Sequence, residues 1–131
     1  LQASILNIKL KYLTNWTSDR RKIAEYYKNN LDNNKFTLTE EKPYNFHVYH
    51  IFSIFSNNAK KLQKYLNENG IGTNLHYPVP AHLQKPYFKL GYHKTDLPVT
   101  EKLSKNQLSI PIYPEMKLSE VKYVLKILNN Y

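Results

Sequence analysis

The sequence predicts an α+β domain of two layers, in which helices pack against a small sheet of about three strands. Residues 47–56 predict a strand because they are rich in β-branched and aromatic side chains. Residues 58–69 and the stretch after Ser119 predict helices because their apolar residues recur at helical spacing. A chain of 131 residues forms one domain that buries roughly two thirds of its unfolded surface.

The first 31 residues are predicted to be helical. Poor helix formers at 15–18 indicate a kink or a break into two helices, but one apolar phase runs through the whole stretch and favours one long bent helix. At roughly 45 Å it is longer than this domain needs, so we expect part of it to pack on another domain or subunit. The residues in phase are Leu6, Leu10, Leu13, Ala24, Tyr27 and Leu31.

Residues 32–45 are expected to form a polar connector, because asparagines and Pro43 interrupt any periodic pattern. The strand at 47–56 follows, with Val48, Phe52 and Ile54 on one face and apolar residues on the other, which predicts cover on both sides.

The helix at 58–69 begins with Asn57 or Asn58 as its cap and ends at Gly70. A second strand at 73–77 would complete a β-α-β unit with the strand before the helix.

Two short helical pieces are predicted at 83–90 and 98–105. A third strand at 107–112 contains Pro111, so it either ends there or lies at a sheet edge. Ser119 is expected to cap the last helix. The inner face of that helix consists of Val121, Val124, Leu125 and Leu128.

The segment 70–84 carries the candidate functional residues Asn74, His76, Tyr77 and His82. Two glycines open the segment and a Pro-x-Pro sequence closes it, so its backbone path is well defined. A histidine at a strand end can donate to a substrate hydroxyl or phosphate, and a tyrosine offers a ring or a phenol. The alternative is that His76 and Tyr77 are core residues bonded to nearby backbone, whereas the prolines place His82 in a surface loop.

Composition excludes several classes of function. The net charge is +9, but no basic run is longer than Arg20-Arg21-Lys22, which favours a solvated basic surface over nucleic acid as a partner. The absence of cysteine excludes disulfides and thiol chemistry and fits a cytoplasmic protein. No apolar run approaches the ~20 residues of a membrane span. Because the sequence begins at Leu1, we expect it to be a piece of a longer protein.

Metal and nucleophile chemistry are not predicted. His47 and His50 point to opposite faces of the expected strand, and two prolines separate His76 from His82. No cysteine or carboxylate cluster completes a metal ligand set, and no Gly-x-Ser-x-Gly sequence occurs.

Three stretches together resemble a known family. HYPVPAHLQKPYFKLGY, the Leu-Pro-x-x-Glu sequence ending at Glu101, and LSIPIYPEM resemble the C-terminal domain of DegT/DnrJ/EryC1/StrS sugar aminotransferases. The N-terminal sequences LQASILNIKLKYL and RRKIAEYY are similar to that family's long interdomain helix. VYHIFSI and LQKYLNENGIGT are similar to its small-domain strand and helix. The resemblance covers essentially all 131 residues in order.

The resemblance implies the small domain of an aspartate-aminotransferase-like (fold type I) enzyme. Members are cytoplasmic homodimers that use pyridoxal phosphate to move an amino group, usually from glutamate, onto a keto-sugar nucleotide. Their products enter surface polysaccharides or antibiotics. HYPVPAHLQ is most similar to members that act on dTDP-linked 3-keto-6-deoxyhexoses.

The resemblance implies that the family's Schiff-base lysine lies in a Ser-x-x-Lys motif of the large domain, which precedes Leu1. Ser104-Lys105 and Ser18-x-x-Arg21 do not match the motif. Residues 1–131 are therefore expected to be the C-terminal domain without the cofactor-binding domain, with no catalytic residue, no cofactor and no activity alone.

What the resemblance leaves to this chain is one wall of the sugar-nucleotide pocket. The expected wall consists of His76, Tyr77 and His82, with Asn74 and Gln84 behind them. A different interpretation is a free-standing module of the same fold that binds a nucleotide or nucleic acid.

Overall fold

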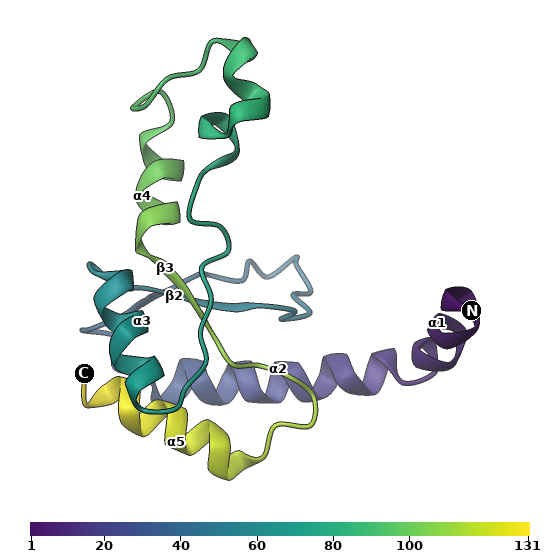
Figure 1. The fold of residues 1–131 in the computed structure, drawn as a ribbon. Coiled ribbons are helices and arrows are strands. Elements are labelled where there is room, and N and C mark those ends of the chain that lie inside the picture. The colour runs from purple at the N-terminus through teal and green to yellow at the C-terminus, as the bar shows by residue number, and fades with distance from the viewer.

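A computed structural model describes residues 1–131 and confirms the α+β class. Three strands form an antiparallel sheet in the order β1-β2-β3, with Phe52 opposite Ile110 in the β2–β3 pair. The elements in chain order are α1 (Gln2–Leu10), α2 (Leu13–Asn30), β1 (Thr37–Leu38), β2 (Phe52–Phe55), α3 (Ala59–Glu68), the 3-10 helices η1 (Ala81–Leu83) and η2 (Lys85–Leu90), α4 (Pro98–Asn106), β3 (Gln107–Ile110) and α5 (Leu118–Asn129) (Figure 1).

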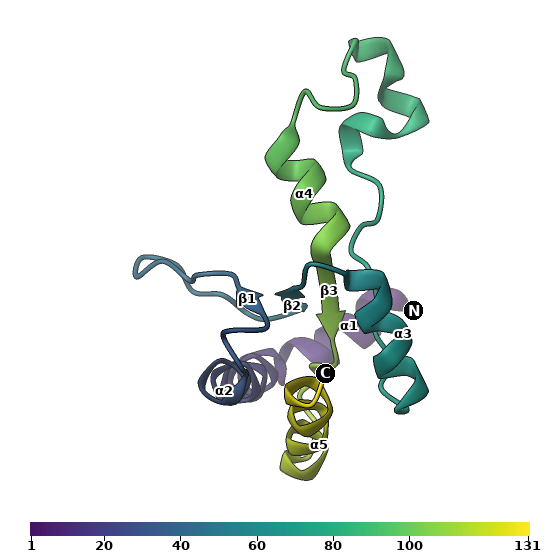
Figure 2. The same cartoon turned by 90° about the vertical axis from the view of Figure 1, so that its left-hand side faces the viewer.

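The hydrophobic core lies where α2, α3 and α5 meet the sheet. Figure 2 shows these three helices gathered around one end of β3, with α4 continuing from the other end. Tyr27 of α2 is fully buried, and the centroid of its ring lies 5.2 Å from that of the Phe52 ring. Its hydroxyl group donates to the Pro111 carbonyl at 3.0 Å. The predicted inner face of the last helix, Val121, Val124, Leu125 and Leu128, is buried as expected.

The prediction of one long N-terminal helix is wrong. The helix breaks at Lys11 and Tyr12, whose N–H groups donate to carbonyls three residues back, and α1 leaves α2 at an angle (Figure 1). The poor helix formers at 15–18 lie inside α2, because each costs only a few tenths of a kcal/mol and α2 gains the burial of its second half. Leu6, expected on the inner stripe, is 58% exposed, and α1 buries no residue.

The strand region also differs from the prediction. The expected connector contains β1, and the strand predicted at 47–56 is reduced to β2. Tyr49 has a φ of 47°, which reverses the alternation there, so Tyr49 is buried and Val48 is exposed.

The second strand predicted at 73–77 is reduced to one isolated bridge between Asn74 and Ser109. The N–H of Leu75 donates to the Asn74 side chain at 2.9 Å instead of to a neighbouring strand, and the prolines that follow have no N–H to offer. The bridge places β3 between β2 and the 74 segment, so the two halves of the expected β-α-β unit do not touch. β3 ends just before Pro111, which agrees with the prediction that the strand ends at this proline.

The predicted helix ends are confirmed for α3 but not for the start of α5. The Asn58 side chain caps α3 by accepting from the Lys61 N–H at 3.0 Å, and Gly70 ends it with a φ of 73°. α5 begins before the predicted cap Ser119, because the Glu120 carboxylate accepts from the Lys117 N–H at 2.7 Å. The short helical pieces are present at η1, η2 and α4.

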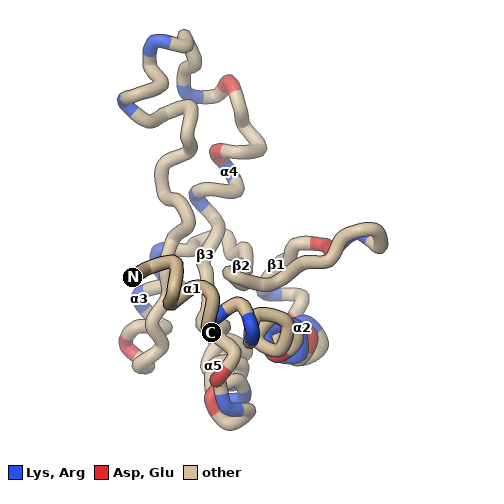
Figure 3. The backbone as a smooth tube through the Cα atoms, turned by 90° about the vertical axis from the view of Figure 1, so that its right-hand side faces the viewer, with Lys and Arg blue, Asp and Glu red and all other residues tan.

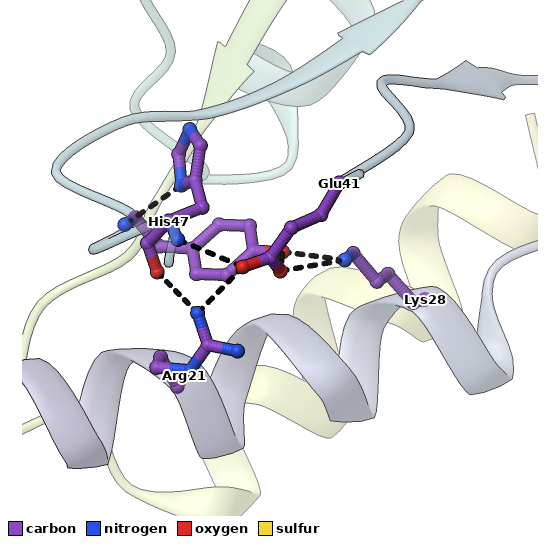
Figure 4. A network of polar contacts seen from close by, with 5 residues as sticks. Arg21, Lys28, Glu41 and His47 are labelled. Atoms are coloured by element: carbon purple, nitrogen blue, oxygen red, sulfur yellow. Dashed lines mark hydrogen bonds and ion pairs between the residues drawn. The ribbon is translucent and has the colours of Figure 1, made fainter. Parts of the chain in front are cut away.

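A polar network holds residues 39–49 against α2 (Figure 4). Arg21 donates to the Glu41 carboxylate at 2.8 Å and to the His47 carbonyl at 2.6 Å. The same carboxylate accepts from the His47 N–H and the Tyr49 hydroxyl, both at 2.7 Å. These hydrogen bonds, that from Arg21 most of all, lower the pKa of Glu41 to about 2.

Residues 77–106, called the arm below, project away from α2 and α5 (Figure 1). His82 is the one buried residue of this segment. No helix in the structure combines the length and the apolar character that crossing a bilayer requires.

Candidate functional site

A hollow of about 350 Å³ lies beside the central strand β3. Three separate stretches form it: residues 50–51 before β2, residues 72–74 with His76 after α3, and residues 109–112 at the end of β3. The polar side chains that line it are His50, Thr73, Asn74, His76 and Ser109.

The bridge between Asn74 and Ser109 sets the geometry of the hollow. The Ser109 N–H donates to the Asn74 carbonyl at 2.8 Å, and the Asn74 N–H donates to the Ser109 carbonyl at 3.2 Å. Both residues also contact His76: its Nδ1 lies 2.9 Å from Ser109 Oγ and its Nε2 lies 3.3 Å from Asn74 Nδ2. The imidazole ring is therefore held from both sides.

The partners of His76 also determine its tautomer. The amide nitrogen of Asn74 can only donate, so Nε2 of His76 accepts. The proton of the neutral ring then lies on Nδ1 and is donated to the hydroxyl oxygen of Ser109. The Ser109 hydroxyl proton stays available to another acceptor. The hollow thus presents the Ser109 hydroxyl, held by the His76 ring, as a donor suited to binding hydroxyl or carbonyl oxygens.

The remaining predicted site residues lie outside the hollow. Tyr77 is 72% exposed, with its ring edge-on to the His76 ring at 5.6 Å, so it lies at the rim. Gln84 is exposed and donates to the Val79 carbonyl at 3.2 Å. The structure therefore brings Asn74, His76 and Tyr77 together and leaves Gln84 on the arm.

The expectation that His82 lies free in a surface loop is wrong. His82 is 7% exposed, and its Nε2 lies 3.2 Å from the Glu101 carboxylate at the start of α4. The helical turn η1 after Pro80 directs the side chain inward. Burial raises the pKa of Glu101, but hydrogen bonds from the Thr95 N–H at 2.7 Å and from His82 outweigh it, so the pKa lies below its ordinary value.

Three residues of the hollow were not predicted: His50, Thr73 and Ser109. His50 is distant in sequence from the segment 70–84, and no local signal links the two. Ser109 alternates with buried Leu108 and Ile110 in β3, a pattern that could have placed it on the opposite face. The buried hydroxyl of Thr73 has no hydrogen-bond partner in the protein, so it is a further polar group that a ligand could satisfy.

The hollow has no lysine and no carboxylate among its lining residues. Nowhere in the structure do three or more histidine or carboxylate side chains gather in a way that could hold a metal ion. The site can therefore bind and orient a ligand, but it offers no amine for covalent chemistry.

Comparison with known proteins gives a consistent result. The sequence model of the DegT/DnrJ/EryC1/StrS aminotransferase family matches residues 1–129. The chain is 38% identical over 129 residues to the "Pleiotropic regulatory protein" of Geobacillus stearothermophilus, covering 96% of the chain and 35% of that protein. It is 37% identical to dTDP-3-amino-3,6-dideoxy-alpha-D-galactopyranose transaminase of Aneurinibacillus thermoaerophilus, covering 100% of the chain and 36% of that protein.

The fold is similar to that of solved structures as well. DesV from S. venezuelae, solved in complex with a ketimine intermediate, aligns with a TM-score of 0.92 at 29% identity, covering 98% of this chain and 35% of DesV. The chain thus spans about a third of the length of the relatives that it matches.

Proposed function

The chain belongs to the DegT/DnrJ/EryC1/StrS aminotransferase family, and we propose that it is the C-terminal domain of a sugar-nucleotide aminotransferase, contributing one wall of the substrate pocket. The observation that carries this proposal is the hollow with its fixed His76, found in a chain that matches the family over residues 1–129. The coverage of about a third of each relative supports a domain of a larger enzyme.

The proposed reaction moves an amino group from glutamate to a keto-sugar nucleotide. The substrate we propose is a dTDP-3-keto-6-deoxyhexose. The printed name of the Aneurinibacillus relative, a transaminase for a dTDP-linked 3-amino-3,6-dideoxy sugar, supports this class. A sugar of this kind presents hydroxyl and carbonyl oxygens, which match the donor groups of the hollow.

Pyridoxal phosphate would supply the electron sink for amino transfer in the intact enzyme. The hollow does not fit that cofactor, because it contains neither a lysine to bind it covalently nor a carboxylate for its ring nitrogen. We therefore assign cofactor binding to the part of the enzyme outside these 131 residues, and we propose that the chain alone does not catalyse amino transfer.

The proposed roles follow from the geometry. His76 holds Asn74 and Ser109 in place, the Ser109 hydroxyl donates its proton to an oxygen of the sugar, and the exposed ring of Tyr77 packs against the sugar or its base. His82 contributes indirectly, because its contact with Glu101 keeps the arm folded next to the rim. Gln84 holds the Pro-x-Pro turn through the Val79 carbonyl.

The exposed apolar helix α1 fits the same proposal. None of its residues is buried within this chain, so it is suited to pack against the cofactor-binding domain or the second subunit of a homodimer.

Amino transfer by the intact gene product tests the proposal. With glutamate and dTDP-3-keto-6-deoxyhexose, we expect formation of 2-oxoglutarate and an amino sugar nucleotide. His76→Ala should raise KM for the sugar nucleotide about tenfold or more, because it removes the two hydrogen bonds that hold Asn74 and Ser109 in place. His93→Ala, which removes an exposed histidine of the arm, is the matched control and should change KM little.

Two results would contradict the proposal. One is an intact reading frame without a Ser-x-x-Lys segment upstream of Leu1, which would favour the free-standing binding module. The other is an intact protein that carries this lysine and converts none of a panel of keto-sugar nucleotides.

A further inference from the structure

A second and larger cavity of about 880 Å³ lies between α4, the start of α3 and the segment that leads into the arm. We call it the lysine groove, because Lys60, Lys94, Lys102 and Lys105 line it. It shares no lining residue with the hollow around His76. The neighbours Leu75 and His76 line different cavities, Leu75 the groove and His76 the hollow.

The four ammonium groups of the groove have no partner of opposite charge. No carboxylate lies within 4.0 Å of any of them, because the ion pairs that lysines form in this protein involve Lys22, Lys28, Lys42 and Lys64 instead. Figure 3 shows the excess of basic over acidic residues on α4 and the arm.

The single carboxylate in the groove does not neutralise these lysines. Glu101 already accepts from the Thr95 N–H at 2.7 Å and faces His82 at 3.2 Å. Like charges that line one cavity repel one another and attract an anion from solution. The groove therefore favours the binding of an anion.

The arrangement of the lysines indicates a multivalent anion. Lys102 and Lys105 are three residues apart on α4, so they share one face of the helix. Lys60 belongs to α3 on another wall of the groove, and Lys94 to the arm. An anion with charge at more than one centre can engage both walls, which a single carboxylate cannot do.

The rest of the lining narrows the ligand class. Asn57, Asn58 and Asn106 offer amide donors, and Leu75, Pro78, Pro80 and Leu83 form the apolar part of the wall. No aromatic side chain lines the groove, so nothing there can stack on a base.

We propose that the lysine groove binds a diphosphate group, with Lys102 and Lys105 on one side and Lys60 on the other. The diphosphate can be free or part of a larger molecule, since the groove recognises the phosphates. This site is separate from the hollow. The proposal that it binds diphosphate can be correct or wrong whatever the outcome for the amino-transfer proposal.

Isothermal titration of the protein with inorganic pyrophosphate, and separately with orthophosphate, tests the site. We expect pyrophosphate to bind and orthophosphate to bind more weakly. The affinity should fall as salt is added, because these charges are exposed to screening. The double substitution Lys102→Gln/Lys105→Gln should weaken pyrophosphate binding about tenfold or more, from the loss of two charge contacts.

The matched control is Lys122→Gln/Lys126→Gln, which removes the same charge from exposed positions of α5. It should change the affinity by less than about twofold. Circular dichroism verifies the fold of both variants, and Lys60→Gln alone provides a milder test on the opposite wall. Absence of pyrophosphate binding, or equal weakening by the α5 control, would overturn the proposal, because attraction would then be due to net charge alone.

Discussion

The Nδ1 atom of His76 lies 2.9 Å from the hydroxyl oxygen of Ser109, a residue 33 positions further along the chain. The backbone bridge between Asn74 and Ser109 brings these side chains together. A shift of this pairing by one residue would turn Ser109 to the other face of β3 and leave His76 without its partner. The geometry of the hollow therefore depends on the register between two segments that are distant in sequence.

Replacement of Ser109 by alanine tests this relationship. Ser109→Ala removes the acceptor of the His76 Nδ1 proton and should raise KM for the sugar nucleotide about two- to tenfold in the intact enzyme, the equivalent of one hydrogen bond of about 1 kcal/mol. Steady-state kinetics measures the effect. Ser119→Ala on the exposed start of α5 is the control. An unchanged KM in Ser109→Ala would show that His76 is not oriented by this contact.

The contact between His82 and Glu101 should determine the stability of the arm. The arm buries little else, so His82→Ala should increase its local opening about five- to thirtyfold, as expected for a loss of one or two kcal/mol. Limited trypsin digestion at Lys89 and Lys94 measures the opening. Gln84→Ala, which removes a surface contact of the same segment, should accelerate cleavage much less. Equal cleavage rates in His82→Ala and the wild type would contradict the role given to His82.

The depressed pKa of Glu41 predicts a specific dependence of stability on pH. Because its pKa falls from 4.5 to about 2 on folding, the unfolded chain binds more protons in that interval. The stabilisation from the Arg21 network is complete above about pH 4.5 and disappears as the pH falls toward about 2.

Thermal unfolding of Glu41→Gln over this range gives the measurement. The difference in Tm between wild type and Glu41→Gln should be largest near neutral pH and should shrink toward about pH 2. Glu68→Gln is the control, because its exposed partner Lys64 lies 3.8 Å away. A Tm difference that does not depend on pH would show that Glu41 acts through packing and not through its charge.

A pair of leucine substitutions tests whether α1 lies outside the core. Leu62→Ala in the buried face of α3 should cost about 2–5 kcal/mol of unfolding free energy. Leu6→Ala on exposed α1 should cost less than about 0.5 kcal/mol in the 131-residue chain. In the intact protein, Leu6→Ala should cost distinctly more, because another domain or subunit then covers α1. Equal costs of Leu6→Ala in the two proteins would contradict that packing.

The sequence predicted those elements whose signals are local. The Asn58 cap and Gly70 delimit α3, and the periodic apolar face of α5 is buried as expected. Asn74 and His76 were found together because both belong to one short segment.

Features that depend on tertiary contacts were not predictable from the sequence. The positive φ of Tyr49 reverses the strand alternation without any glycine to signal it. The extended segment after Gly72 forms one bridge because the Leu75 N–H is taken by the Asn74 side chain. Ser109 and His50 join the hollow only through the fold, and the burial of His82 depends on Glu101, 19 residues away.

The most direct test of the central claim is an amino-transfer assay on the purified 131-residue chain, with its fold verified by circular dichroism. The assay supplies pyridoxal phosphate, glutamate and dTDP-3-keto-6-deoxyhexose. We expect 2-oxoglutarate to form no faster than with the free cofactor alone, because this domain has no lysine in its substrate wall. Turnover above that background would contradict the account, since the reactive amine would then lie within these residues.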